Sequence, residues 1–123
     1  MIATPETTEP IVLRHDRDGV ATLTLNRPAA RNALSAALMS ELEDAFGAIA
    51  KDVDVKVVIL AANGPAFCAG HDLKEMRANP GRQHYEALFT QCSRLMMAIT
   101  RLPRPVIAKV HATATAAGCQ LVA

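Results

Sequence analysis

The 123-residue sequence has no tryptophan, only 3% aromatic residues, and a formal net charge of +1. Nucleic-acid-binding surfaces depend on an excess of Lys and Arg and often on aromatic side chains that stack on bases. We therefore expect no nucleic-acid partner. Long hydrophobic runs are also missing, because the longest purely apolar run covers only Val57–Ala62. A helix that crosses a bilayer needs about 20 apolar residues, so we expect no membrane association.

Cysteine is scarce as well. Cys68, Cys92 and Cys119 are odd in number, widely spaced and surrounded by apolar residues, which predicts buried, reduced thiols. The opening residues carry no Lys or Arg before Arg14, so the sequence predicts neither a secretory signal nor a transit peptide. Both features favour a cytoplasmic protein. The four histidines show none of the short spacings of metal sites, and we expect no metal ion.

The remaining pattern predicts an α/β fold. Residues 1–10 resemble a flexible polar tail, and residues 11–123 form one folded portion. Ser35 precedes apolar residues at helical spacing and is expected to cap a helix. A second long helix is predicted to bury one stripe of side chains. The expected strands are 11–15, 20–26, 56–62 and 105–110, and the expected helices are 35–51, 73–77, 81–102 and one from 117. The predicted stripe on helix 81–102 is Tyr85, Leu88, Phe89, Cys92, Leu95, Met96 and Ile99.

The order of these elements indicates a hairpin followed by at least one parallel crossover. The last helix would begin near Ala117 and have about two turns, which is marginal without a packing partner. We therefore expect the chain to be a portion of a larger domain.

Two segments, FCAGHDLKEM (67–76) and ATAAGCQL (114–121), share one design. Each follows an apolar strand, contains Ala and Gly where the backbone must turn tightly, and leads into a helix. Amides at helix starts have no intrahelical acceptor and bind negative charge. Two such corners side by side would form an oxyanion hole. Either corner, taken alone, also fits a second interpretation, in which it is simply a tight turn with no chemical role.

Single residues in these segments also have two interpretations. Asp72 could contribute to a site or cap the short helix. Lys74 and Arg31 could bind phosphate or remain solvated charges. For His71 the backbone N–H matters under the oxyanion interpretation, whereas a catalytic imidazole is the weaker alternative.

Three segments together resemble the crotonase superfamily, the enoyl-CoA hydratase and isomerase family. They are LNRPAARNALS (25–35), KVVILAANGPAFCAGHDLKEM (56–76) and RLPRPVIAKVHATATAAGCQL (101–121). The resemblance implies the N-terminal part of a crotonase-like spiral of ββα units. It also implies an acyl-CoA thioester as ligand, a homotrimer or hexamer, and no cofactor other than the coenzyme A of the substrate.

The resemblance further implies roles for individual residues. The backbone N–H groups of His71 and Ala117 would form the oxyanion hole. The residues implied to contact coenzyme A are Arg31, Ala33, Ala69, Asp72, Leu73 and Lys74, together with His71 and Ala117 of the oxyanion hole.

Two positions depart from the family pattern. Gln120 stands where hydratases have a glutamate that activates water, and Ala117 replaces the middle glycine of the third motif. An amide orients a water molecule but does not accept its proton at neutral pH. The second catalytic glutamate would lie beyond Ala123. Two functions therefore stay open: an enzyme that stabilises an enolate of an acyl-CoA, or a non-catalytic acyl-CoA-binding module or inactive half-domain.

Overall fold

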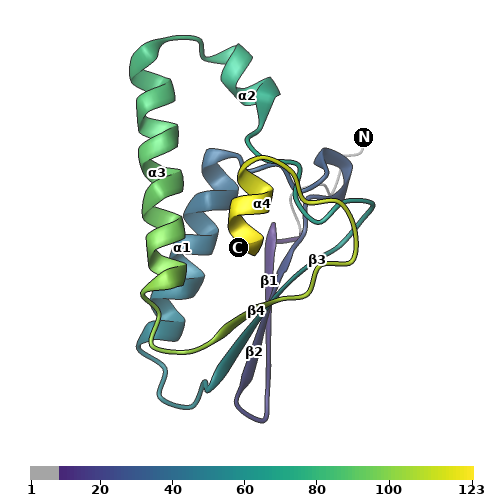
Figure 1. The fold of residues 1–123 in the computed structure, drawn as a ribbon, viewed down its shortest axis with the longest axis vertical. Coiled ribbons are helices and arrows are strands. Elements are labelled where there is room, and N and C mark those ends of the chain that lie inside the picture. The colour runs from purple at the N-terminus through teal and green to yellow at the C-terminus, as the bar shows by residue number, and fades with distance from the viewer. Residues whose placement is uncertain (1–8) are drawn as a thin grey trace, which may run out of the picture.

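The computed structural model describes residues 9–123. The predicted tail over residues 1–10 therefore lies mostly outside the described residues. A single four-stranded sheet has the order β1-β2-β3-β4, and the two long helices α1 and α3 run side by side along it (Figure 1). The strands are β1 Val12–Arg17, β2 Val20–Leu25, β3 Val57–Ala62 and β4 Val106–Ala108, and the helices are η1 Pro28–Ala30, α1 Ala36–Ala50, α2 Leu73–Ala78, α3 Arg82–Thr100 and α4 Ala117–Val122.

The hairpin is tighter than predicted. Strand β1 continues to Arg17, which pairs with Val20 across a two-residue turn. Asp18 and Gly19 occupy the turn with φ values of 52° and 82°, the left-handed backbone that two-residue hairpin turns require. The four-residue turn expected over residues 16–19 was wrong, because the sequence pattern does not distinguish the last strand residues from turn residues.

The parallel crossovers are confirmed. Strand β2 pairs with β3 in parallel, and β3 pairs with β4 in parallel. Helix α1 connects the first pair and α3 connects the second. The chain therefore builds a mixed α/β fold in which successive helices return to the same side of the sheet.

Helix α1 begins as the sequence predicts. The Ser35 hydroxyl accepts a hydrogen bond from the Leu38 amide at 3.1 Å, which satisfies one of the unpaired N–H groups at the helix start. Leu38, Leu42 and Phe46 lie on the buried face of this helix. They pack with alternate residues of β2 and β3 to form the core: Ala21, Leu23, Leu25, Val58 and Leu60.

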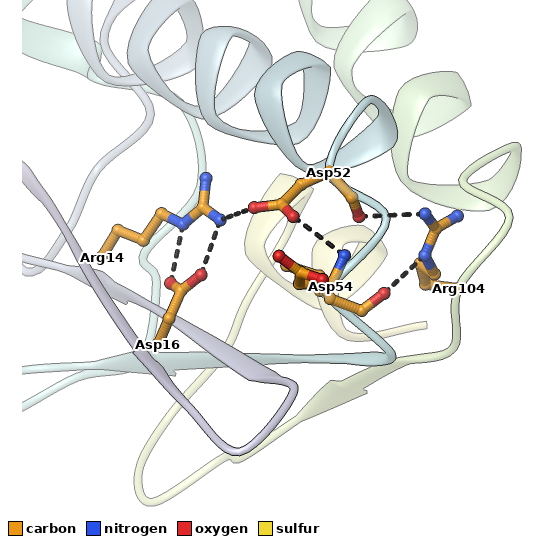
Figure 2. Close-up of polar contacts among 6 residues, drawn as sticks. Arg14, Asp16, Asp52, Asp54 and Arg104 are labelled. Atoms are coloured by element: carbon orange, nitrogen blue, oxygen red, sulfur yellow. Dashed lines mark hydrogen bonds and ion pairs between the residues drawn. The ribbon is translucent and has the colours of Figure 1, made fainter.

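Two arginines fasten the loop after α1 to its neighbours (Figure 2). Arg104 donates hydrogen bonds to the backbone carbonyls of Val55 at 2.6 Å and Asp52 at 3.1 Å. From the other side, Arg14 pairs with Asp16 and Asp52. These contacts tie the hairpin, the end of α1 and the loop before β4 together, at the end of the sheet that lies away from α2 and α4.

Two predictions about burial need correction. Cys68 and Cys92 are buried, but Cys119 is exposed, because α4 turns Ala117, Gly118 and Leu121 inward instead. On α3 the predicted stripe is narrower than expected, since Phe89 is 47% exposed. None of the described helices is long and apolar enough to cross a membrane.

Candidate functional site

The loop before α1 and the first corner together line one open groove of about 570 Å³. Most residues that the resemblance assigns to coenzyme A lie here, which confirms that the fold brings them together but does not test their roles. Three cationic side chains and a single carboxylate line the groove, so it has an excess of positive charge. The predicted residues in its lining are Arg31, Ala33, Ala69, His71, Asp72, Leu73 and Lys74.

Asn32 holds the groove loop in place, a role that the sequence analysis missed. Its side chain is fully buried, accepts from the Arg27 amide and donates to the carbonyls of Asn63 and Ala66. Arg31 and Asn32 both have left-handed backbone, with φ near 53° and 55°, a conformation that asparagine tolerates better than most residues. An asparagine that stands between two apolar segments of the sequence was the signal that could have identified this role.

Arg27 also contributes to the groove without having been predicted. Its guanidinium donates to the Ala33 carbonyl at 2.6 Å and to Asp72 Oδ2 at 3.1 Å. This side chain therefore connects the loop before α1 with the first corner. It also leaves Arg31 and Lys74, which make no ion pair within residues 9–123, as the unpaired cations of the groove.

Asp72 caps α2, in agreement with the alternative that this residue caps the short helix. Its Oδ1 accepts from the Glu75 amide at 3.1 Å, while Oδ2 pairs with Arg27. Burial alone would raise the pKa of Asp72, but hydrogen bonds from the Glu75 amide and from Arg27 outweigh it and lower the pKa. The carboxylate is thus ionised at neutral pH and committed to the protein.

We expect Asp72→Asn to lower the free energy of unfolding at pH 7 by about 0.5–1 kcal/mol, because asparagine still caps a helix but cannot pair with Arg27. The lowered pKa stabilises the folded state above the pKa of the unfolded state, and this stabilisation disappears as pH falls through the folded pKa. Urea unfolding at neutral and at strongly acid pH measures the destabilisation at pH 7 and its disappearance in acid. Asp44→Asn, on the exposed face of α1, is the control. If Asp72→Asn still had a lower free energy of unfolding than the unaltered protein in strong acid, the pairing of the ionised Asp72 with Arg27 would be contradicted.

The two small-residue corners lie directly against each other. Phe67 and Thr115 donate backbone hydrogen bonds across them, to Thr113 and Cys68 respectively. Gly70 has φ near 92°, and a Cβ atom on it would lie 3.1 Å from the Ala116 Cβ and 3.5 Å from the Ala117 nitrogen. Only a glycine fits both the backbone conformation and the space.

Both N–H groups predicted for the oxyanion hole are unpaired within residues 9–123. His71 forms a parallel bridge with Leu34 in which Gly70 and Asp72 supply the hydrogen-bonding groups. The His71 amide therefore points away from Leu34. Ala117 is the first residue of α4, so its N–H has no acceptor in its own helix.

A second, more apolar cavity of about 310 Å³ adjoins His71. It is formed largely by α3, and Gln120 reaches it from α4. The sequence analysis placed Phe89 on the buried stripe of α3, but Phe89 is 47% exposed and the neighbouring Met97 is 42% exposed, because no described element packs over that side of α3. The lining is His71, Phe89, Cys92, Ser93, Met96, Met97 and Gln120.

The His71 ring has an unusual environment. Its Nδ1 atom is buried and has no hydrogen-bond partner among the described residues. The ring meets Phe89 edge to face, with centroids 5.2 Å apart. Burial lowers the pKa of His71, so the imidazole is neutral at pH 7. Within residues 9–123, no three His, Cys, Asp or Glu side chains gather as a metal site would require.

Comparison with known proteins agrees with this geometry. Residues 15–123 match the family described as enoyl-CoA hydratase/isomerase. The chain is 42% identical to the rat mitochondrial enoyl-CoA hydratase domain-containing protein 3 over 98% of its length, and 39% identical to the 2,3-dehydroadipyl-CoA hydratase of Escherichia coli over 92%. It spans only 40% and 42% of those two relatives.

Solved structures show the same fold. An enoyl-CoA hydratase from Mycobacterium smegmatis matches with a TM-score of 0.90 and 62% identity, covering 92% of this chain and 44% of that one. The human enoyl-CoA hydratase domain-containing protein 3 matches with a TM-score of 0.86 and 42% identity, covering 91% and 44%. The predicted fold, the N-terminal part of a crotonase-like α/β domain, is confirmed.

The expectation of a cytoplasmic protein is contradicted by these comparisons. The rat, mouse and human relatives are all named as mitochondrial. The cysteine argument could not have decided the matter, since free thiols exclude an oxidising compartment but do not distinguish among reducing ones.

Proposed function

Because the chain belongs to the enoyl-CoA hydratase/isomerase family, we propose that it binds an acyl-CoA thioester and stabilises the enolate of that thioester. The negative charge would develop on the thioester oxygen, between the backbone N–H groups of His71 and Ala117. Fixed donors of this kind lower a barrier because they need no reorganisation as the charge develops.

The observation that carries this proposal is the contact between the two corners. Two unpaired amides come from segments more than 40 positions apart in the sequence, and Gly70 allows Ala116 and Ala117 to approach the backbone beside His71. A pair of tight turns with no chemical role would not need both amides free at the point of contact. Buried or partly buried N–H groups are normally paired.

The groove and the cavity supply the two ends of the proposed ligand site. Arg31 and Lys74 would contact coenzyme A phosphates, and the small residues Ala33 and Ala69 would leave room for the pantetheine arm. The acyl chain would enter the apolar cavity that Phe89 helps to line. Asp72 and Leu73 would contact the nucleotide side of the ligand, and coenzyme A would be the only cofactor.

Gln120 favours the alternative of an acyl-CoA-binding module. It lies in the proposed acyl cavity where family hydratases are expected to have a carboxylate, and its amide orients water without accepting a proton. The enzyme proposal therefore requires an acid–base group other than Gln120.

The homotrimer or hexamer is likewise a proposal for the whole protein, which sedimentation of the protein as its gene encodes it would test.

The proposal is tested by ¹³C NMR of butanoyl-CoA labelled at the thioester carbonyl. Binding should move the carbonyl resonance downfield, because two hydrogen bonds polarise the C=O group. Gly70→Ala should reduce both the shift and the affinity, since Gly70 has a positive φ and the added Cβ would press against the Ala116 Cβ and the Thr115 carbonyl oxygen, next to the Ala117 amide. Gly81→Ala is the matched control, because Gly81 also has a positive φ but has open space around it.

The outcomes separate the two functions. A downfield shift that Gly70→Ala removes and Gly81→Ala keeps supports enolate stabilisation. Binding without a shift supports the binding module. Absence of any affinity for acyl-CoA contradicts both.

A further inference from the structure

His71 occupies a position that no other described residue shares. It lines the charged groove and also the apolar cavity. A ligand that extends from one to the other must therefore pass this side chain. Because the backbone N–H of the same residue is the proposed oxyanion donor, the imidazole lies close to the carbonyl end of such a ligand.

The imidazole is not used by the protein itself. Neither ring nitrogen makes a hydrogen bond within residues 9–123, and Nδ1 is buried without a partner. Most buried polar atoms in proteins are paired, so an unpaired one needs an explanation. Its one specific contact is with the Phe89 ring, which fixes the position of the imidazole but uses neither nitrogen.

The other polar groups of the cavity cannot serve as a base. Gln120 and Ser93 have no useful basicity at neutral pH, and burial raises the pKa of the Cys92 thiol, which keeps it protonated. On the groove side, Asp72 is held by Arg27 and by the start of α2. The charged or titratable groups that share a lining with His71 are Cys92 on α3, Arg27 and Arg31 before α1, and Asp72 and Lys74 at α2.

We propose that the His71 imidazole is an acid–base group that removes and returns a proton at the α-carbon of the bound acyl thioester. This inference rests on the proposed function. The ring nitrogen Nε2, which is not buried as Nδ1 is, takes the α-proton, the C–H electron pair forms a C=C bond, and the carbonyl π pair moves to the thioester oxygen, which the two backbone amides hold. Return of the proton from the imidazolium to carbon restores the thioester, so no further reactant is consumed.

The test is exchange of the α-protons of butanoyl-CoA in D₂O, followed by mass spectrometry on the protein as its gene encodes it. His71→Asn keeps the backbone N–H and removes the basic ring. We expect it to lower the exchange rate by roughly 100-fold, the lower end of the usual effect of an acid–base group, while the affinity for butanoyl-CoA is retained.

His84→Asn is the matched control. His84 also has a buried, unpartnered ring nitrogen, but it lies outside the groove and the cavity, so its replacement should leave exchange unchanged. His71→Gln serves as a second variant if the first does not fold. The exchange rate of the unaltered protein should rise with pH through the titration of His71, read from its imidazole NMR signal, and reach a plateau above it.

Each result decides the proposal. Loss of exchange with retained binding, confined to the His71 variants, supports it. Exchange that persists in His71→Asn or His71→Gln, or that does not follow the His71 titration, overturns it. Binding of butanoyl-CoA without any exchange in the unaltered protein also overturns it but leaves acyl-CoA binding intact, whereas absence of binding contradicts the proposed function itself.

Discussion

Replacing Gly118 with alanine is expected to lower the free energy of unfolding by roughly 3 kcal/mol, the upper end of the usual cost of overpacking. A Cβ atom on Gly118 would overlap the carbonyl oxygen of Cys68 and lie 2.9 Å from both its carbonyl carbon and its Cβ. The obstacle is mostly backbone, which cannot move aside as a flexible side chain can. Relief would require the two corners to separate, and the Ala117 amide would move with them.

Gly47→Ala provides the matched control for this substitution. Gly47 lies within α1, and an added Cβ would meet nothing within 4 Å. Alanine in an exposed helical position should stabilise the protein by about 0.5–1 kcal/mol relative to glycine. Urea unfolding of both variants measures the two effects, and equal stability changes of the same sign would contradict the close packing of the corners.

Local sequence signals were sufficient for the elements of the fold. Ser35 followed by apolar residues at helical spacing gave α1 almost to the residue, because capping and periodicity act over a few positions. The parallel arrangement followed from the order of elements. The end of β1 was misplaced, since Arg17 in a strand and Arg17 in a turn have the same local pattern.

The site was less predictable, because it depends on contacts between distant segments. Small residues at the two corners indicated tight turns, but only the fold places Gly70 against Ala116. Arg27 and Asn32 were missed because their roles come from partners such as Asp72 and Ala66, which are more than 30 positions away. Phe89 was assigned to the core because periodicity identifies an apolar face without showing what covers it.

Gln120→Glu is expected to raise the rate of but-2-enoyl-CoA hydration by roughly 100-fold, since a positioned general base contributes 10²–10⁴-fold. Gln120 lines the same cavity as His71 and is exposed to solvent. A glutamate there would therefore remain solvated and ionised, and it would not require burial of a new charge. Loss of the enoyl absorbance with time measures the reaction.

Gln83→Glu makes the same chemical change on the exposed surface of α3, away from both the cavity and the groove, and should leave the hydration rate unchanged. A gain confined to Gln120→Glu would mean that the unaltered protein binds the substrate correctly but lacks the base for adding water. It would also separate hydration from the α-proton exchange assigned to His71, because exchange needs no water activated at position 120. Binding of but-2-enoyl-CoA by Gln120→Glu without any hydration would show that water does not reach this side of the ligand, and the proposed position of the acyl chain would be wrong.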